Sequence, residues 1–170
     1  MILRPATPED TAALATLGRE SFCAAFEHLY RPEDLATFLA ETYSDEAVAE
    51  EIADDRCIHR LADDGARLLG FVKLRAPSWY VEFSDAPNPI ALGQLYTQPD
   101  LTGRGIGTAL TDWAMAEARM RGHDAVQLSV WSENYRAQAF YHRYGFAKIA
   151  DISFWVGEHR DDEFLFEKRF

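Results

Sequence analysis

The chain has 170 residues, of which 48% are hydrophobic and 13% aromatic, so it can bury one apolar core. Its formal net charge of -11 disfavours nucleic acid as a partner, because neutralising phosphates requires clustered Lys and Arg. No apolar run approaches the roughly 18 to 20 residues of a membrane helix, and the N-terminus lacks the pattern of a secretory signal. These features predict one cytoplasmic domain over residues 1–170, binding neither nucleic acid nor a membrane.

The cysteines, Cys23 and Cys57, show neither CxxC nor metal-ligand spacing. The sequence therefore predicts no disulfide framework and no metal site. We expect both side chains to be small buried apolar groups.

The first third of the chain is predicted to be mostly helical after a short strand over residues 1–5. Thr7 is suited to cap a first helix with Pro8 at its first helical position. Further start signals at residues 31–34 and at Ser44 predict a second helix and a third over residues 45–54. The expected buried stripe of the first helix is Leu14, Leu17, Phe22, Phe26 and Leu29.

Strands and helices then alternate, which is typical of an α/β fold. Apolar, β-prone segments at 57–62 and 67–75 flank the turn formers Asp63-Asp64-Gly65 and predict a hairpin. Residues 76–89 contain three prolines and predict a long loop or a broken hairpin. The remaining predictions are strands over 90–97, 124–131, 146–156 and 163–168, and helices over 105–121 and 135–144.

A glycine-rich turn lies between the strand predicted over 90–97 and the helix that follows it. Gly103, Gly105 and Gly107 stand at every second position. Such a turn leaves N–H groups unpaired at the positive end of the helix dipole, which suits a pyrophosphate. The spacing fits neither a P-loop nor a Gly-x-Gly-x-x-Gly fingerprint. It therefore indicates another kind of phosphate site or a flexible connector.

A second motif runs from Trp131 to Phe146. Ala137, Phe140, Tyr141 and Tyr144 fall at i, i+3, i+4 and i+7 and share one helix face, and Gly145 is suited to end the helix. Phe140 and Phe146 fit core aromatics. Tyr141 fits either a buried aromatic or a functional hydroxyl.

The two motifs, in this order and spacing, resemble those of the GNAT acyltransferases. The likeness extends from residues 2–10 to the final strand. It is nearest to bacterial acetyltransferases that act on polyamines, through residues 26–30 and 128–134. It implies a single central mixed, mostly antiparallel sheet of six to seven strands flanked by helices. A splayed pair of strands would hold acetyl-CoA, the cosubstrate.

The resemblance also implies individual roles. Leu95, Tyr96 and Thr97 would bind the pantetheine arm through backbone groups, and Asn134 would hydrogen-bond it. Tyr141 would protonate the departing thiolate, because an ordinary tyrosine pKa of about 10 keeps the hydroxyl protonated. The pyrophosphate would be held by the main-chain amides of Gly103, Arg104, Gly105, Ile106, Gly107 and Thr108.

The implied chemistry is direct attack of an amine on the thioester, with main-chain N–H groups of the splayed strand stabilising the oxyanion. It needs neither a metal nor a covalent intermediate. Two positions depart from the family pattern: Thr102 replaces the usual Gln or Arg, and Ala91 replaces a proton-relaying Glu. The general base is therefore unassigned, with the candidates Glu27, His28, Glu82, Asp85 and Glu133. A water chain or an already neutral amine could also serve.

The predicted function is acetyl transfer to a primary amine of a small molecule, a polyamine being favoured because the acidic chain attracts cations. The acceptor pocket would be lined by the first two helices and the loop 77–89. The alternatives are a protein N-terminal or lysine acetyltransferase and a catalytically silent acyl-CoA sensor. A homodimer is expected by analogy only, through exposed candidates such as Trp155 and Phe164, which fit core strand residues equally well.

Overall fold

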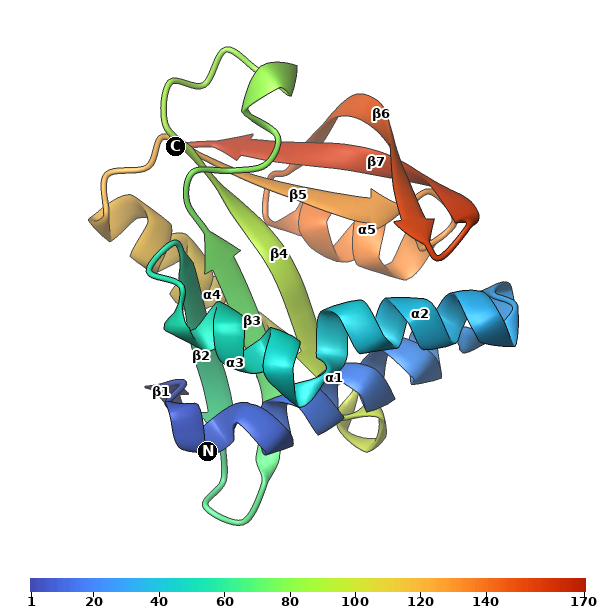
Figure 1. The fold of residues 1–170 in the computed structure, drawn as a ribbon. Coiled ribbons are helices and arrows are strands. Elements are labelled where there is room, and N and C mark those ends of the chain that lie inside the picture. Colours follow the sequence, from blue (N-terminus) through green and yellow to red (C-terminus); the bar gives the residue numbers. More distant parts are fainter.

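The computed structural model describes residues 1–170 and contains one seven-stranded sheet in the order β1-β2-β3-β4-β5-β7-β6 (Figure 1). Neighbouring strands are antiparallel except for the parallel pair β4 and β5. The predicted mixed, mostly antiparallel sheet is confirmed. The strands are β1 (Ile2–Pro5), β2 (Cys57–Asp63), β3 (Leu68–Arg75), β4 (Pro89–Thr97), β5 (Ala125–Trp131), β6 (Ala147–Val156) and β7 (His159–Arg169); the helices are α1 (Thr11–Phe26), α2 (Pro32–Tyr43), α3 (Asp45–Ala53), α4 (Ile106–Met120) and α5 (Tyr135–Arg143).

The predicted elements are all present, with local differences at their ends. Strand β7 begins well before the predicted residue 163, because Val156 pairs with His159 across a tight turn in which Gly157 has φ +58°. In the first helix, Phe26 is only half-buried, and Leu29 lies beyond its end in a single 3₁₀ turn. The predicted helix stop at Gly145 is confirmed by its left-handed φ of +86°.

Each face of the sheet has its own apolar core, because side chains alternate along a strand. On β3, Phe71 joins Leu14 of α1 and Val48 of α3, whereas the adjacent Val72 joins Leu110 of α4. Helices α1 to α3 therefore cover one face, and α4 and α5 cover the other (Figure 1). A third cluster around Phe22 ties α1 and α2 to β6.

Strands β4 and β5 part soon after they meet, which confirms the predicted splay. They pair only where residues 89–91 lie beside residues 125–127, and Figure 1 shows them diverging beyond that point. The edge of β4 that faces β5 therefore has no partner strand from Leu92 onward. A bulge at Gly93 further interrupts its pairing with β3, since Lys73 pairs with Gln94 and Leu74 with Leu92.

The structure also bears on the predictions for the cysteines, for Trp155 and Phe164, and for membrane helices. Cys23 and Cys57 are half-buried, so the prediction of buried thiols was wrong in degree. Trp155 is 58% exposed on the edge strand β6, whereas Phe164 packs against the main core. The homodimer stays a prediction. None of the helices is long and apolar enough to cross a membrane.

Candidate active site

Two cavities flank the point at which β4 and β5 separate. The first is a groove of about 660 Å³ that runs along β4 to the N-terminus of α4 and along α5. Its lining residues include nearly all of the predicted cofactor contacts: Leu95, Thr97, Gly103, Gly105, Ile106, Gly107, Thr108, Asn134 and Tyr141. The exceptions are Tyr96 and Arg104.

The two exceptions have clear structural reasons. Because side chains alternate along a strand, Leu95 and Thr97 face the groove, whereas Tyr96 between them faces the second cavity. Only the backbone of Tyr96 remains available to a ligand in the groove. The Arg104 amide donates to the Leu101 carbonyl at 3.2 Å, so it is not free for a phosphate.

The glycine turn presents the start of α4 without obstructing side chains. Gly105 is its N-cap at φ +81°, a conformation that L side chains rarely adopt. The first helical amides, from Ile106 to Thr108, precede the first intrahelical bond, which Ala109 makes to the Gly105 carbonyl. Arg136 and Arg143 of α5 also line the groove. This end of the groove is built for an anion.

Asn134 and Tyr141 mark the two ends of one side of α5. The Asn134 Oδ1 caps the helix by accepting from the Ala137 amide at 3.1 Å, which leaves its NH₂ group free for a ligand. Tyr141 is 9% exposed, and burial raises its pKa above the ordinary value, with the Tyr96 charge adding to the effect. Its hydroxyl therefore stays protonated at neutral pH.

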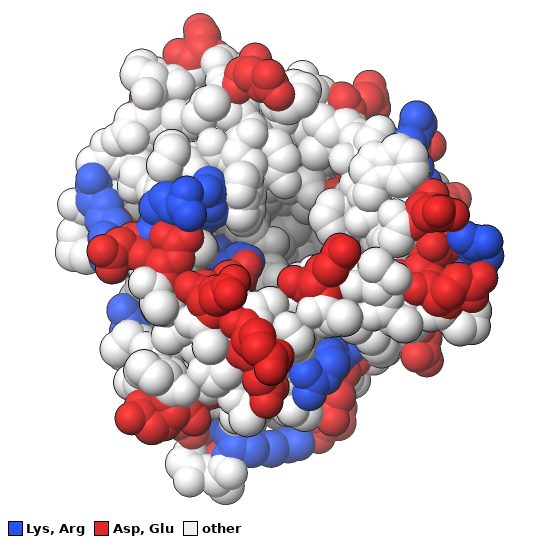
Figure 2. All heavy atoms as spheres, in the orientation of Figure 1, with Lys and Arg blue, Asp and Glu red and all other residues white.

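The second cavity, of about 420 Å³, opens on the face covered by α1 and α2. Figure 2 shows it as a hollow near the centre of that face, with uncharged atoms above it and acidic residues along its lower border. The walls expected from the first two helices and the loop 77–89 are present. They are mainly aromatic: Phe22, Phe26, Tyr30, Phe38, Tyr43, Trp79, Tyr80, Tyr96, Trp131 and Phe154.

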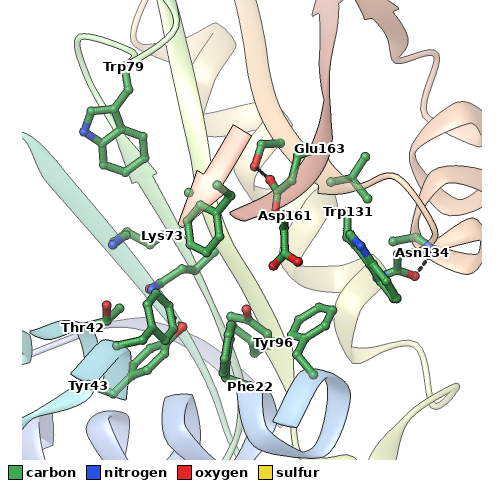
Figure 3. Close-up of a pocket in the computed structure, with 18 of the residues that line it drawn as sticks. Phe22, Thr42, Tyr43, Lys73, Trp79, Tyr96, Trp131, Asn134, Asp161 and Glu163 are labelled. Carbon is green, nitrogen blue, oxygen red and sulfur yellow. Dashed lines mark hydrogen bonds between the residues drawn. The ribbon is translucent and has the colours of Figure 1, made fainter. Parts of the chain in front are cut away.

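Two carboxylates of β7, Asp161 and Glu163, point into this cavity from the same side (Figure 3). Asp161 accepts a hydrogen bond from the Tyr30 hydroxyl and lies 3.1 Å from Nε2 of His159. Glu163 Oε2 accepts from the Ser129 hydroxyl. Burial raises the pKa of Glu163 to about 6; the Ser129 bond opposes this shift and the charge of Asp161 adds to it.

A cation lies on the opposite side of the cavity. Lys73 is 4% exposed, and its Nζ is 2.7 Å from Oε1 of Glu51. The Trp79 ring lies 5.7 Å from the same Nζ, and His59 approaches the other Glu51 oxygen at 3.7 Å. Figure 3 shows Lys73 on one side of the cavity and Asp161 and Glu163 on the other. Because Glu51 pairs with Lys73, the cavity has an acidic side and a side with a neutralised ion pair.

None of the five predicted candidates for the general base lines this cavity. Their side chains are exposed, and Asp85 pairs instead with Arg169. Ala91 is fully buried, so β4 supplies no carboxylate at that position. Asp161 and Glu163 are not among the candidates predicted from the sequence, although Asp161, Glu163 and Glu167 fall at alternate positions interrupted only by Leu165, which is a period-2 signal of a largely polar strand face.

The two cavities meet at three residues that line both of them: Asn134, Ala137 and Tyr141. A ligand in the groove and a ligand in the aromatic cavity would therefore meet beside the Tyr141 hydroxyl. A mixed sheet that opens into two joined cavities beside a glycine-rich helix start defines an acyl-CoA-dependent acyltransferase of the GNAT type.

Comparison with known proteins agrees. Residues 22–146 match the Acetyltransferase (GNAT) family, and the chain belongs to this family. An uncharacterised N-acetyltransferase of Lactobacillus delbrueckii subsp. lactis is 27% identical over 94% of this chain and 92% of its own. A spermidine N(1)-acetyltransferase of Thermoplasma acidophilum is 26% identical over 99% and 96%. The protein is an acyltransferase, and the alternative of a silent sensor is set aside.

The fold is shared with solved structures. The PaiA N-acetyltransferase from Thermoplasma acidophilum, solved in complex with coenzyme A, superimposes with a TM-score of 0.81 at 24% identity, covering 99% of this chain and 98% of that one. The ribosomal-protein-S18-alanine N-acetyltransferase from Escherichia coli gives a TM-score of 0.72 at 16% identity, covering 99% and 92%. Both likenesses show the fold, and neither assigns an acceptor to this chain.

Proposed function

We propose that the protein transfers the acetyl group of acetyl-CoA to a primary amine of a small molecule, with a polyamine-like amine favoured. The observation that carries this proposal is the junction of the two cavities at Tyr141. One cavity offers backbone amides and arginines to a phosphorylated cosubstrate. The other offers aromatic walls and two carboxylates to a cation.

The residues of the groove fit acetyl-CoA. The helix start at Ile106 to Thr108 suits the pyrophosphate, and Arg136 and Arg143 add positive charge. The unpaired edge of β4 suits the amide-bearing pantetheine arm, which would hydrogen-bond it as an added strand. The free NH₂ group of Asn134 would donate to the same arm. These contacts leave the thioester at the junction.

Tyr141 is the proposed general acid. Its side chain borders both cavities, and burial raises its pKa, so the hydroxyl holds a proton that it can give to a thiolate. Amides of the free edge of β4, near the Gly93 bulge, would stabilise the oxyanion that develops on the acetyl carbonyl.

An amine is the acceptor that the aromatic cavity suits best. Ammonium groups are attracted to aromatic faces and to carboxylates, and Trp131 and Tyr96 line the cavity beside Asp161 and Glu163. A volume of about 420 Å³ fits a small molecule. The relative named spermidine N(1)-acetyltransferase supports a polyamine-like acceptor.

One observation favours a second acceptor class. Lys73 is buried in the cavity wall, and its ammonium has a single hydrogen bond, to Glu51. An acetyl-acceptor substrate with a carboxylate or carbonyl group, such as an amino acid or a peptide N-terminus, could accept a hydrogen bond from the Lys73 ammonium. The two classes differ in the sign of the charge that approaches Lys73.

Calorimetry with acetyl-CoA, followed by thiol-release assays with polyamines, amino acids and N-terminal peptides, tests the proposal. We expect binding, and release that depends on a primary amine and is fastest with polyamines. Thiol release only with amino acids or peptides would replace polyamines with that second class of acceptor. Failure of acetyl-CoA to bind would overturn the proposal.

A further inference from the structure

The aromatic cavity contains two carboxylates, and their oxygen atoms are engaged differently. Both oxygens of Asp161 have partners, because Oδ2 accepts from Tyr30 and Oδ1 lies 3.1 Å from His159. Glu163 uses only Oε2, which accepts from Ser129. Its Oε1 has no hydrogen-bond partner in the protein and is therefore available to a ligand.

The backbone fixes the direction of Glu163. It pairs with Trp131 on β5 and with Ile152 on β6, in the middle of a three-stranded part of the sheet. Leu165, two residues further along β7, is fully buried on the same face, whereas Phe164 between them belongs to the core on the other side. Glu163 therefore points into the cavity from a rigid strand.

We propose that Glu163 is the general base of the acetyl transfer, taking a proton from the acceptor ammonium through its free Oε1, and that Asp161 holds that ammonium by charge. This inference rests on the proposed function. It fills the position left by Ala91, which is buried and has no proton-accepting group. A carboxylate on β7 thus replaces one on β4, from the other side of the opening between β4 and β5.

The proton balance of the step is complete. The ammonium loses one proton to Glu163, and the neutral nitrogen then attacks the thioester carbon. The C–N bond forms and the C–S bond breaks, while Tyr141 gives its proton to the sulfur. The second proton that the nitrogen loses restores Tyr141. Each turnover therefore releases one proton to solvent through Glu163.

The surroundings of Glu163 suit a base that works near neutral pH. Burial raises its pKa to about 6, so it is ionised at pH 7 but binds a proton more readily than an exposed carboxylate. The other charged and titratable groups that line the cavity are Asp161 beside it on β7 and, on the remaining walls, Tyr30 after α1, Tyr43 on α2, Lys73 on β3, Tyr80 in the loop before β4, Tyr96 on β4 and Tyr141 on α5.

The first test compares wild type with Glu163→Gln, which keeps the shape of the side chain. We expect kcat/KM for the amine to fall by about 10²- to 10³-fold, with acetyl-CoA affinity unchanged by calorimetry. The wild-type profile of kcat/KM should rise with pH along a limb near pH 6, and the variant should lack it. A variant with the wild-type rate and the same limb overturns the assignment. Absence of amine-dependent turnover in wild type would instead overturn the proposed function itself.

Substitution of the neighbours Ser129 and Asp161 should shift the pH of this limb in opposite directions, which a loss of packing would not do. Ser129→Ala removes a bond that lowers the pKa of Glu163, so the limb should move to higher pH. Asp161→Asn removes a negative charge that raises it, so the limb should move to lower pH, with a higher KM for the amine. Opposite shifts support the proposal, and a limb that stays in place in both variants contradicts it.

Discussion

The cofactor groove and the aromatic cavity are built in opposite ways. The groove consists of the edge of β4, the start of α4 and one side of α5, and it presents the unpaired edge of β4 and the first amides of α4. The cavity is formed by side chains from α1, α2, β3, β4, β5, α5, β6, β7 and the loop before β4. A site made of backbone binds one ligand common to a family, whereas a site made of side chains can change its ligand by substitution.

Tyr141 belongs to both regions, so its substitution should have the largest effect. We expect Tyr141→Phe to lower kcat by about 10²- to 10³-fold, because the thiolate loses its proton donor. Acetyl-CoA affinity should stay nearly unchanged. The matched control is Tyr144→Phe, since the Tyr144 hydroxyl bonds Asp112 and Thr108 and lines neither cavity. An unchanged kcat in Tyr141→Phe would remove the residue from the acid role.

Gly107→Val should disable the groove alone. Gly107 has no positive φ, and an added Cβ would meet nothing nearer than Thr97 at 4.0 Å, so the fold should tolerate the change. The new side chain would occupy space beside the helix amides and weaken acetyl-CoA binding by about 30-fold, or about 2 kcal/mol. Calorimetry measures this. Ala116→Val, on an exposed position of the same helix, is the control, and equal affinities in both variants would contradict the location of the groove.

Lys73→Met should alter the cavity alone and separate the two acceptor classes. For a polyamine we expect KM to fall by about 3- to 10-fold, because the variant removes a cation from the wall and leaves the negative charge of Glu51 without its Lys73 counter-ion. A KM that rises, most strongly for acceptors bearing a carboxylate, would favour the second class. The control Arg67→Met removes an exposed ion pair, with Asp100, that lies outside both cavities, and it should leave KM unchanged.

Glu163→Gln should also stabilise the fold slightly at neutral pH. The folded pKa of Glu163, about 6, exceeds its ordinary value of 4.5. The folded state therefore holds more protons between these values, and stability falls as pH rises through that window. We expect a gain of about 1 to 2 kcal/mol in the variant above pH 6 and none below about pH 4. Chemical denaturation at several pH values measures it, and a destabilised variant at pH 7 would indicate a structural role.

The same contrast explains what the sequence could predict. Gly103, Gly105, Asn134 and Tyr141 lie in two short segments whose glycine spacing and helical period carry the signal, and the structure places all four in the groove. The fold followed from the same local patterns, together with the family resemblance. Only strand and helix ends, such as the start of β7, were displaced.

The acceptor side could not be predicted in this way. Tyr30 and Asp161 are 131 residues apart, and Ser129 and Glu163 are 34 apart. They meet only because β5 and β7 pair and because α1 crosses the sheet. The candidates for the base predicted from the sequence lie in loops and short turns, and their side chains are exposed. Placing Asp161 and Glu163 of β7 in the cavity requires knowing the register in which β7 pairs with β5.

The most direct test of the two-region account is a crystal structure of the protein with CoA and the amine that turns over fastest. We predict the pyrophosphate at the start of α4, the sulfur within hydrogen-bond reach of the Tyr141 hydroxyl, and the amine between Asp161 and Glu163. An acceptor bound away from β7, or CoA outside the groove of β4, α4 and α5, would contradict the account.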